Sequence, residues 1–365
     1  MKKDTLIIEK TKLVGIDLAK NVFQLHGVDE VGKVTFKRRI GRSELLAFVS
    51  KQIPICTIVT EACSGSSYWA REFIKLGHEA KLISPQFVKP FVKTNKTDAH
   101  DAEAITIAAK QSDMKFMPIN SEEEQDIQAI HRMRERLVGG RTALVNQARG
   151  LLSEYGIIAP QGIAKIRILL ATLIGNTGND LKKIDKNEGE NNLKITDIMK
   201  ALCDEISDEL IAIDERIKKC DIKIQAIAST NPTCQRLLTA PGVGPLTATI
   251  LLTVLSNPAL FKNGRHFAAF LGLVPKQYSS GEKQRLLSIS KRGDKYIRSL
   301  LVHGARSVLL NASKKKDDRS EWIKKLHERR GHNCTCVAIA NKNARLLWAL
   351  AMNAAEYQVN YKKAA

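Results

Sequence analysis

Four acidic residues occupy positions from which chemistry on a phosphate could be assembled. Asp98 and Asp101 are three residues apart, so on a helix both carboxylates would point the same way. Like charges this close repel each other, and a cation between them or screening by water relieves the repulsion. Asp17 and Glu61 each end an apolar run further upstream. The alternative for Asp98 and Asp101 is a plain helix start after Thr97 as N-cap, where the helix dipole favours acids.

The elements that must position these acids are predicted strands of one sheet. Apolar and alternating runs predict five strands, at Leu13–Asp17, Val22–Val28, Val34–Arg38, Cys56–Thr60 and Ala80–Ile83. Helices are predicted from Ser43 and over Trp69–Leu76. Three strands followed by alternating helices and strands is the order of a ribonuclease-H-like α/β sheet. If the strands that end at Asp17 and Glu61 pair, their carboxylates stand side by side.

Carboxylates gathered at one sheet edge suit a divalent metal site. Carboxylate oxygens are the hard ligands that Mg²⁺ prefers, and two such ions clamp the attacking and leaving oxygens of a phosphodiester. Each acid alone is weak evidence, because an acid after a strand is commonly a turn residue or a helix cap. The four in this order predict a magnesium site that acts on nucleic acid.

The charge balance indicates a polyanionic partner. The 365 residues include 58 Lys and Arg against 38 Asp and Glu, a net charge of +20. Nucleic acid is the default partner for such a chain. A membrane is not expected, because no stretch of about 18 consecutive apolar residues occurs. The short apolar run near the start does not fit a signal peptide, and seven cysteines favour free thiols. We therefore expect a cytoplasmic protein.

The middle of the chain is predicted to be helical. Apolar residues recur at helical spacing over Ser121–Leu152, an Arg-rich run that we expect to be interrupted or kinked near Gly139–Gly140. Its arginines suit either a solvated face or a nucleic-acid contact. Heptad spacing over Ile206–Ile227 predicts a coiled-coil seam, within the chain, between subunits, or both.

The C-terminal third carries two features that suit phosphate binding. Gly242 and Gly244 lie in a turn between predicted helices that resembles a helix-hairpin-helix, where backbone N–H groups could approach a phosphate. An ordinary helix-helix turn is the alternative. Residues 276–330 hold 16 Lys and Arg against 6 Asp and Glu, a density typical of a phosphate-backbone groove. Candidate nucleic-acid contacts are Lys96, Gly242, Gly244, Arg285, Lys291 and Arg292.

Three segments carry a family resemblance. Gly15–Lys20, Thr60–Gly65 and Lys96–Ala102 resemble the RuvC-like domain of the DEDD-type insertion-sequence transposases, also called bridge-RNA-guided recombinases. The resemblance implies that the tetrad holds Mg²⁺, with Mn²⁺ as an alternative ion. The tetrad consists of Asp17, Glu61, Asp98 and Asp101. Gly65-Ser66-Ser67-Tyr68 departs from the Gly-Thr-Tyr that the family usually shows, without touching the acids.

Arg265–Gly281 and Ser288–Asp294 resemble the second domain of the same transposases. The resemblance implies that Ser280 is the nucleophile, and spacing alone does not exclude its neighbour Ser279. A Ser-Ser-Gly run by itself is more often a flexible turn. No His or Asp adjoins Ser280, so a composite site with the metal-bound acids is expected. The resemblance also implies a phosphoserine intermediate, a guide RNA encoded by the element, and a homo-oligomer, either a dimer or a tetramer.

These expectations define an α/β plus all-α protein that acts as a DNA transposase. The expected segments are a tail at 1–11, a RuvC-like metal-binding domain at 12–120, a helical and coiled-coil region at 121–230, and a helical transposase domain at 231–365. Two other functions compete. A metal-dependent nuclease of Holliday-junction type would need only the acids, and a non-catalytic nucleic-acid-binding protein would need only the basic surface.

Overall fold

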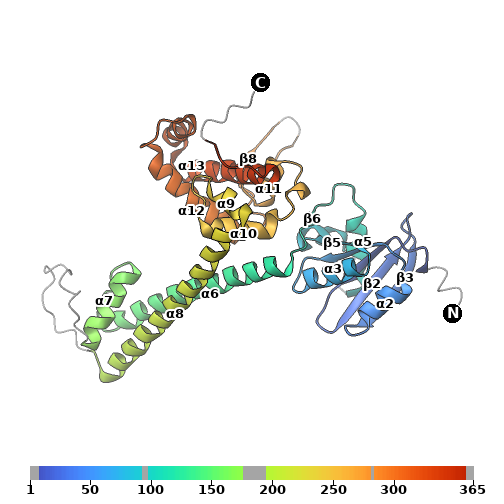
Figure 1. Ribbon diagram of the computed structural model, residues 1–365. Coiled ribbons are helices and arrows are strands. Elements are labelled where there is room, and N and C mark those ends of the chain that lie inside the picture. Colours follow the sequence, from blue (N-terminus) through green and yellow to red (C-terminus); the bar gives the residue numbers. More distant parts are fainter. Residues whose placement is uncertain (1–7, 93–97, 176–194, 281–282, 359–365) are drawn as a thin grey trace. The chain divides into compact units, whose positions relative to one another are not determined.

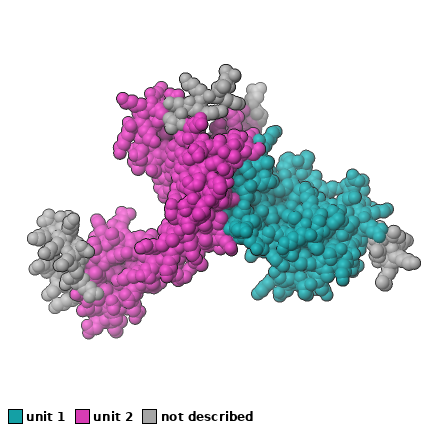
Figure 2. Space-filling model, viewed as in Figure 1, with its two compact units in different colours: residues 1–125, 253–262 teal, residues 126–252, 263–365 magenta. Residues whose placement is uncertain are grey.

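The computed structural model describes residues 8–92, 98–175, 195–280 and 283–358. Lys96 and the N-cap expected at Thr97 lie outside the described residues. The chain divides into two compact units, shown in different colours in Figure 2. Unit 1 consists of residues 1–125 and 253–262, and unit 2 consists of residues 126–252 and 263–365.

Unit 1 is built on a mixed six-stranded sheet in the order β3-β2-β1-β4-β5-β6 (Figure 1). The strand β4 pairs in parallel with both β1 and β5, and the remaining pairs are antiparallel. The strands are β1 (Leu13–Asp17), β2 (Val22–Val28), β3 (Val34–Gly41), β4 (Thr57–Glu61), β5 (Glu79–Ile83) and β6 (Phe116–Met117). All five predicted strands are present, and the topology is compatible with the expected ribonuclease-H-like order.

Helices cover both faces of this sheet because successive side chains of a strand point to opposite sides. Ile58 on β4 joins a core cluster that includes Trp69, whereas its neighbour Val59 joins a second cluster that includes Ile105. The first cluster lies under α2 and α3, and the second lies under α4 and α5. The helices of unit 1 are α2 (Leu45–Gln52), α3 (Ser66–Lys75), α4 (Pro85–Val88), the 3₁₀ turn η1 (Lys89–Phe91) and α5 (Asp98–Ala109).

The middle of the chain is a helical hairpin. It consists of α6 (Glu122–Ser153), α7 (Ile163–Ile174) and α8 (Asp197–Thr230). The predicted interruption of α6 is wrong, since the helix runs unbroken through Gly139 and Gly140. The heptad residues of α8 pack against α6, where Leu137 contacts the seam at Ile217. The seam predicted from the heptads is therefore used within the chain.

The C-terminal part is helical, with one small hairpin. Its helices are α9 (Pro232–Leu238), α10 (Pro245–Leu255), the 3₁₀ turn η3 (Pro258–Leu260), α11 (Gly264–Phe270), α12 (Lys295–Ala312) and α13 (Asp318–Asn353). The two-stranded sheet consists of β7 (Pro275–Gln277) and β8 (Leu286–Ile289). A non-helical Gly331 kinks α13. Among the described helices, none combines the length and apolar character that crossing a bilayer requires.

Candidate active site

Asp17 and Glu61 end neighbouring parallel strands of unit 1. Ile16 of β1 is in register with Thr60 of β4, so the next residues along, Asp17 and Glu61, leave the sheet side by side. Strands of one sheet lie about 4.8 Å apart. Both acids are half-buried. Their strands therefore place two carboxylates at the same sheet edge, as the sequence predicts.

Gly15 lets α5 come close to β1. A side chain at Gly15 would overlap Thr106 and the carbonyl of Ala102, both on α5. Thr106 Oγ1 donates to the carbonyl oxygen of Ala102, 2.9 Å away, and lies 3.3 Å from that of His26 on β2. These contacts fix the first turn of α5, where the remaining two acids lie, beside the end of β1.

The result is a cluster of three carboxylates. One carboxylate oxygen from each of Asp17, Asp98 and Asp101 lies within 4.8 Å of the other two. Asp98 is exposed, and the other two side chains are half-buried. Neither Asp98 nor Asp101 forms an ion pair with a described lysine, arginine or histidine. Three carboxylates this close to one another fit a divalent cation, whose charge would offset their repulsion.

Glu61 lies outside this group of three, but its charge and that of Asp17 act on the same neighbouring thiol. Burial, followed by the negative charges of Glu61 and Asp17, raises the pKa of the Cys63 thiol. Cys63 lies two residues after β4, where the charges of both carboxylates affect the pKa of its thiol. Its raised pKa makes Cys63 a poor thiolate nucleophile at neutral pH.

Ser280 belongs to unit 2 and sits on the β7–β8 hairpin. Ser280 and Lys283 pair as an isolated antiparallel bridge, with the Lys283 N–H donating to the Ser280 carbonyl at 3.2 Å. The flanking Tyr278 N–H donates to the carbonyl of Arg285 at 2.9 Å. Every described side chain between Pro275 and Ser288 is exposed. The hairpin therefore presents Ser280 to solvent.

The two adjacent serines differ in how their hydroxyls are used. Ser279 Oγ accepts from Gln277 Nε2 at 3.1 Å and from the Arg285 N–H at 3.4 Å. Ser280 Oγ forms no hydrogen bond with any side chain or backbone group that the structure describes. The Ser279 hydroxyl is therefore engaged within the hairpin, whereas both serines are exposed to solvent.

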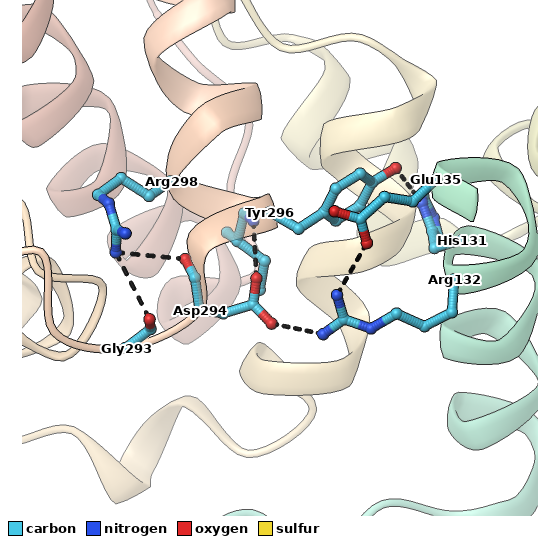
Figure 3. Close-up of polar contacts among 8 residues, drawn as sticks. His131, Arg132, Glu135, Gly293, Asp294, Tyr296 and Arg298 are labelled. Atoms are coloured by element: carbon cyan, nitrogen blue, oxygen red, sulfur yellow. Dashed lines mark hydrogen bonds and ion pairs between the residues drawn. The ribbon is translucent and has the colours of Figure 1, made fainter. Parts of the chain in front are cut away.

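The end of the hairpin is locked to the helices around it (Figure 3). Arg298 Nη1 donates to the carbonyls of Leu271 at 3.1 Å and Arg292 at 3.2 Å. It also lies 3.5 Å from the carbonyls of Gly293 and Asp294, the two contacts that Figure 3 draws. A side chain at Gly293, where φ is +81°, would overlap the Phe270 carbonyl. Asp294 caps α12 by accepting from the Ile297 N–H at 3.0 Å. The hairpin strands are exposed, but the loop that follows them is fixed.

Two contacts tie α6 to this loop and to α12. Arg132 Nη2 of α6 donates to Asp294 Oδ2 at 2.8 Å (Figure 3). His131, which is fully buried, lies 3.0 Å through Nδ1 from the Tyr296 hydroxyl and 2.9 Å through Nε2 from Thr249 Oγ1. Burial, followed by the positive charges of two neighbouring arginines, lowers the pKa of His131 to about 4. These two residues connect the helical hairpin to the base of the serine hairpin.

The candidate nucleic-acid contacts fall into two groups. Arg285, Lys291 and Arg292 are exposed on or next to the serine hairpin. Gly242 instead packs against α12, because a side chain there would overlap the Gly304 carbonyl. Gly244 has open space around it. In this turn, Gly242 therefore serves helix packing, and Gly244 is the glycine with room for a phosphate.

Most of the arginines on α6 have partners within the protein. Arg134 Nε donates to Asp221 Oδ1 of α8 at 2.5 Å, and Arg141 Nη1 donates to Asp214 Oδ1 of α8 at 2.8 Å. Arg149 donates to backbone carbonyls beyond the end of α6. Arg134 and Arg141 therefore pair across the helical hairpin, and the contact with nucleic acid weighed for the arginines of α6 stays a prediction.

Comparison with known proteins yields matches along most of the chain. A family model described as "Transposase" of the DEDD, IS110 type matches residues 14–157, and one described as "Transposase IS116/IS110/IS902 family" matches residues 234–321. A probable family 20 transposase of Pseudomonas aeruginosa is 46% identical over 338 residues, covering 92% of this chain and 96% of the relative. The transposase for insertion sequence element IS1111A of Coxiella burnetii is 42% identical over 349 residues, covering 96% and 92%. The transposase for insertion sequence element IS1328 of Yersinia enterocolitica is 38% identical, covering 92% and 95%.

Proposed function

The chain belongs to the DEDD-type IS110 family of insertion-sequence transposases, and from this premise we propose that its clustered acids hold Mg²⁺ while Ser280 attacks DNA. The observation that carries the proposal is the approach of Asp17, Asp98 and Asp101 to within 4.8 Å of one another. Glu61, at the adjacent strand end, completes the set. Mn²⁺ is an alternative ion because it accepts the same oxygen ligands.

The proposed reaction is a pair of transesterifications. The Ser280 hydroxyl attacks a phosphodiester, its oxygen bonds to phosphorus, and the bond from phosphorus to one deoxyribose oxygen breaks. The serine proton is given up and the departing sugar oxygen gains one. A hydroxyl of another strand then attacks the phosphoserine and releases Ser280. Because each step exchanges one phosphate ester for another, the ends rejoin without an external energy source.

Each part of the site has a distinct role in this scheme. A divalent metal held by the acids would supply the positive charge that stabilises the phosphorane-like transition state. The acids hold that metal, and the edge formed by β1, β4 and α5 fixes their position. The basic side chains around Ser280 bind the phosphate backbone of DNA on either side of the attacked bond. A serine without a local base depends on this assembly for activation.

The deciding experiment is to trap a covalent protein–DNA adduct on the ends of the protein's own element, in Mg²⁺, and to map the modified residue. We expect an adduct with the wild type and with Ser279→Ala, and none with Ser280→Ala. Asp98→Asn should also give none, whereas Asp126→Asn, at an exposed acid on α6, should behave as the wild type.

Other results would support the competing functions. Strand cleavage by Ser280→Ala that leaves free hydroxyl ends would identify a metal-dependent nuclease of Holliday-junction type. Recombination that survives both Asp17→Asn and Asp98→Asn would remove the catalytic role of the acids and leave a binding protein. An independent readout is thermal stability: at Mg²⁺ tenfold above its dissociation constant, binding stabilises the fold by about 1.4 kcal/mol. This gain should be absent in Asp98→Asn.

The proposal extends to the partners that the family resemblance implies. Family membership supports a guide RNA encoded by the element and a homo-oligomer, a dimer or tetramer. The net charge of +20 supports the RNA, which is a polyanion. RNA that copurifies with the protein, resists deoxyribonuclease and maps to the element would establish the guide. Light scattering of the complex on DNA would give the subunit number.

A further inference from the structure

A positively charged pocket lies in unit 2, and no residue of the β7–β8 hairpin lines it. It is formed by the start of α11 and by the part of α13 that follows the kink at Gly331. Its lining includes Asn263, Arg265, Lys342, Arg345 and Trp348. In sequence this part of α13 is rich in Ala and Leu, which favours a core or subunit contact and does not single out its cations.

The fold brings these cations together through one close helix contact. A side chain at Gly264 would lie 2.9 Å from the Arg345 carbonyl, so the start of α11 rests directly on the backbone of α13. Lys342, Arg345 and Trp348 follow one another at intervals of three residues and share one face of α13. Arg265, one residue after Gly264, therefore joins the two α13 cations across the pocket.

The cations of the pocket are not balanced by acids. Partial burial, followed by the positive charges of Arg319 and Arg345, lowers the pKa of Lys342. Lys342 Nζ lies 4.1 Å from the ring centroid of Trp322, a cation–π contact that supplies no countercharge. Within the described residues, Arg265, Lys342 and Arg345 form no ion pair with a carboxylate. Gathered cations without a partner favour binding of an anion.

A second hollow on the same helix has cations whose charge is balanced by neighbouring acids. It lies before the kink and is lined by Lys325 and Arg329 together with Asp318 and Glu321. There the pair of cations has a pair of acids beside it. Each hollow has one tryptophan in its lining, Trp322 before the kink and Trp348 after it, and the pocket after the kink has the same cation types but no lining acid. Aromatic rings next to arginine and lysine are typical of sites that bind single-stranded nucleic acid by its phosphates and stack a base.

We propose that the pocket of Arg265, Lys342 and Arg345 binds the phosphodiester backbone of a nucleic-acid strand, with a base or sugar against Trp348. The shared ligand chemistry is the phosphodiester, whether the strand is DNA or RNA. None of the four acids lines the pocket, nor does Ser280, and the proposal stands without either catalytic role. It adds a binding site on α11 and α13 to a protein whose family acts on DNA.

The test is binding of three fluorescent probes by the full chain without divalent metal: a 20-nucleotide oligo(dT), a 20-nucleotide oligo(U) and a 20-base-pair duplex. The test variant is Lys342→Gln with Arg345→Gln. Its control is Lys325→Gln with Arg329→Gln, which removes one Lys and one Arg from the same helix at the acid-lined hollow. Lys342→Arg keeps the charge and should keep the affinity. Circular dichroism melting checks that each variant is folded.

We expect the test variant to bind at least one probe about tenfold more weakly than the control variant. The slope of log K against log salt should also fall by about 0.7–0.9 for each phosphate that the variant no longer neutralises. A weaker affinity for oligo(U) alone assigns the pocket to RNA, and a weaker affinity for oligo(dT) or the duplex assigns it to DNA. Equal affinities and salt slopes for test and control variants on all three probes would overturn the proposal. Because no metal or strand cleavage is involved, that failure would leave the catalytic proposal intact.

Discussion

Gly15 shows how one residue without a side chain sets the geometry of the acid cluster. It lies in the middle of β1, two residues before Asp17, and faces α5 at Thr106. Any side chain there would push α5 away from the strand, and the first turn of α5 would carry Asp98 and Asp101 with it. The distance between the acids of α5 and the acid of β1 therefore depends on a residue that binds nothing itself.

His131 makes the stability of unit 2 depend on pH. Its pKa is lowered from 6.5 to about 4, by burial first and then by Arg134 and Arg132, with Asp221 acting in the opposite direction. Below pH 6.5 the unfolded chain takes up a proton on this histidine that the folded protein does not. The contribution of His131 to stability is therefore complete above pH 6.5 and is lost as pH falls towards 4.

This linkage gives a test at the scale of one residue. Between pH 7 and pH 5 the wild type should lose roughly 2 kcal/mol of unfolding free energy through His131. His131→Gln should be less stable at pH 7, because the contacts with Tyr296 and Thr249 are altered, and the gap to the wild type should narrow by that amount at pH 5. Urea unfolding at both pH values measures it. His303→Gln, at an exposed histidine of α12, is the control, and a gap that stays constant with pH would contradict the assignment.

At the scale of elements, the turn between α9 and α10 is held by α12. Gly242 has φ of +79°, and its backbone touches that of Gly304 so closely that a side chain on either residue would overlap the other. The two glycines therefore set the distance between the turn and the helix capped by Asp294, the residue at the base of the serine hairpin. Packing, more than phosphate access, explains why Gly242 is a glycine.

Replacing two helical glycines by alanine should distinguish the effect of tight packing on stability from the effect of helix propensity. Gly304→Ala should destabilise the protein by about 1–3 kcal/mol, because the added methyl group has no space against Gly242. Gly139→Ala, in the exposed middle of α6 with nothing nearby, should stabilise it by about 0.5–1 kcal/mol. Chemical denaturation of both variants measures the difference. A Gly304→Ala protein as stable as the wild type would show that the turn and α12 are not in close contact.

At the scale of the whole molecule, excess positive charge governs the encounter with nucleic acid. The net charge is +20, and half of the excess lies in residues 276–330, which include the serine hairpin. Each phosphate that a lysine or arginine neutralises releases counterions, so binding weakens steeply as salt rises. The arginines of α6 contribute less than their number suggests, since Arg134 and Arg141 are paired with α8.

The salt dependence of duplex DNA binding tests whether the cations near the serine hairpin contact DNA phosphates. When six to ten phosphates are neutralised, affinity should fall about 10³–10⁵-fold between 50 and 200 mM salt. Arg285→Gln with Arg292→Gln should reduce the slope of log K against log salt by about 1.8, since two phosphates keep their counterions. Lys218→Gln with Lys219→Gln, at exposed positions of α8, removes the same charge and should leave the slope unchanged. If the two double variants have equal salt slopes, DNA affinity depends only on the protein's total charge and not on where the cations lie.

The sequence by itself determined the local elements and the residue types at their ends. Apolar alternation predicted β1 to β5, and the strand-end positions of Asp17 and Glu61 followed from it, because these patterns are set by neighbours along the chain. The two-residue strand β6 is too short to show periodicity. The family resemblance supplied Ser280, since no local base marks it as a nucleophile.

The tertiary structure alone decided which distant residues meet. Contact between Gly15 and Thr106 places three acids together, and contact between Gly264 and Arg345 gathers the cations of the pocket. Arg134 and Arg141 of α6 have partners within the protein because acids of α8 lie opposite them. Such contacts join residues tens of positions apart in the sequence. They depend on how closely two backbones approach in the folded protein, and the pattern of neighbouring residues along the chain does not encode that distance.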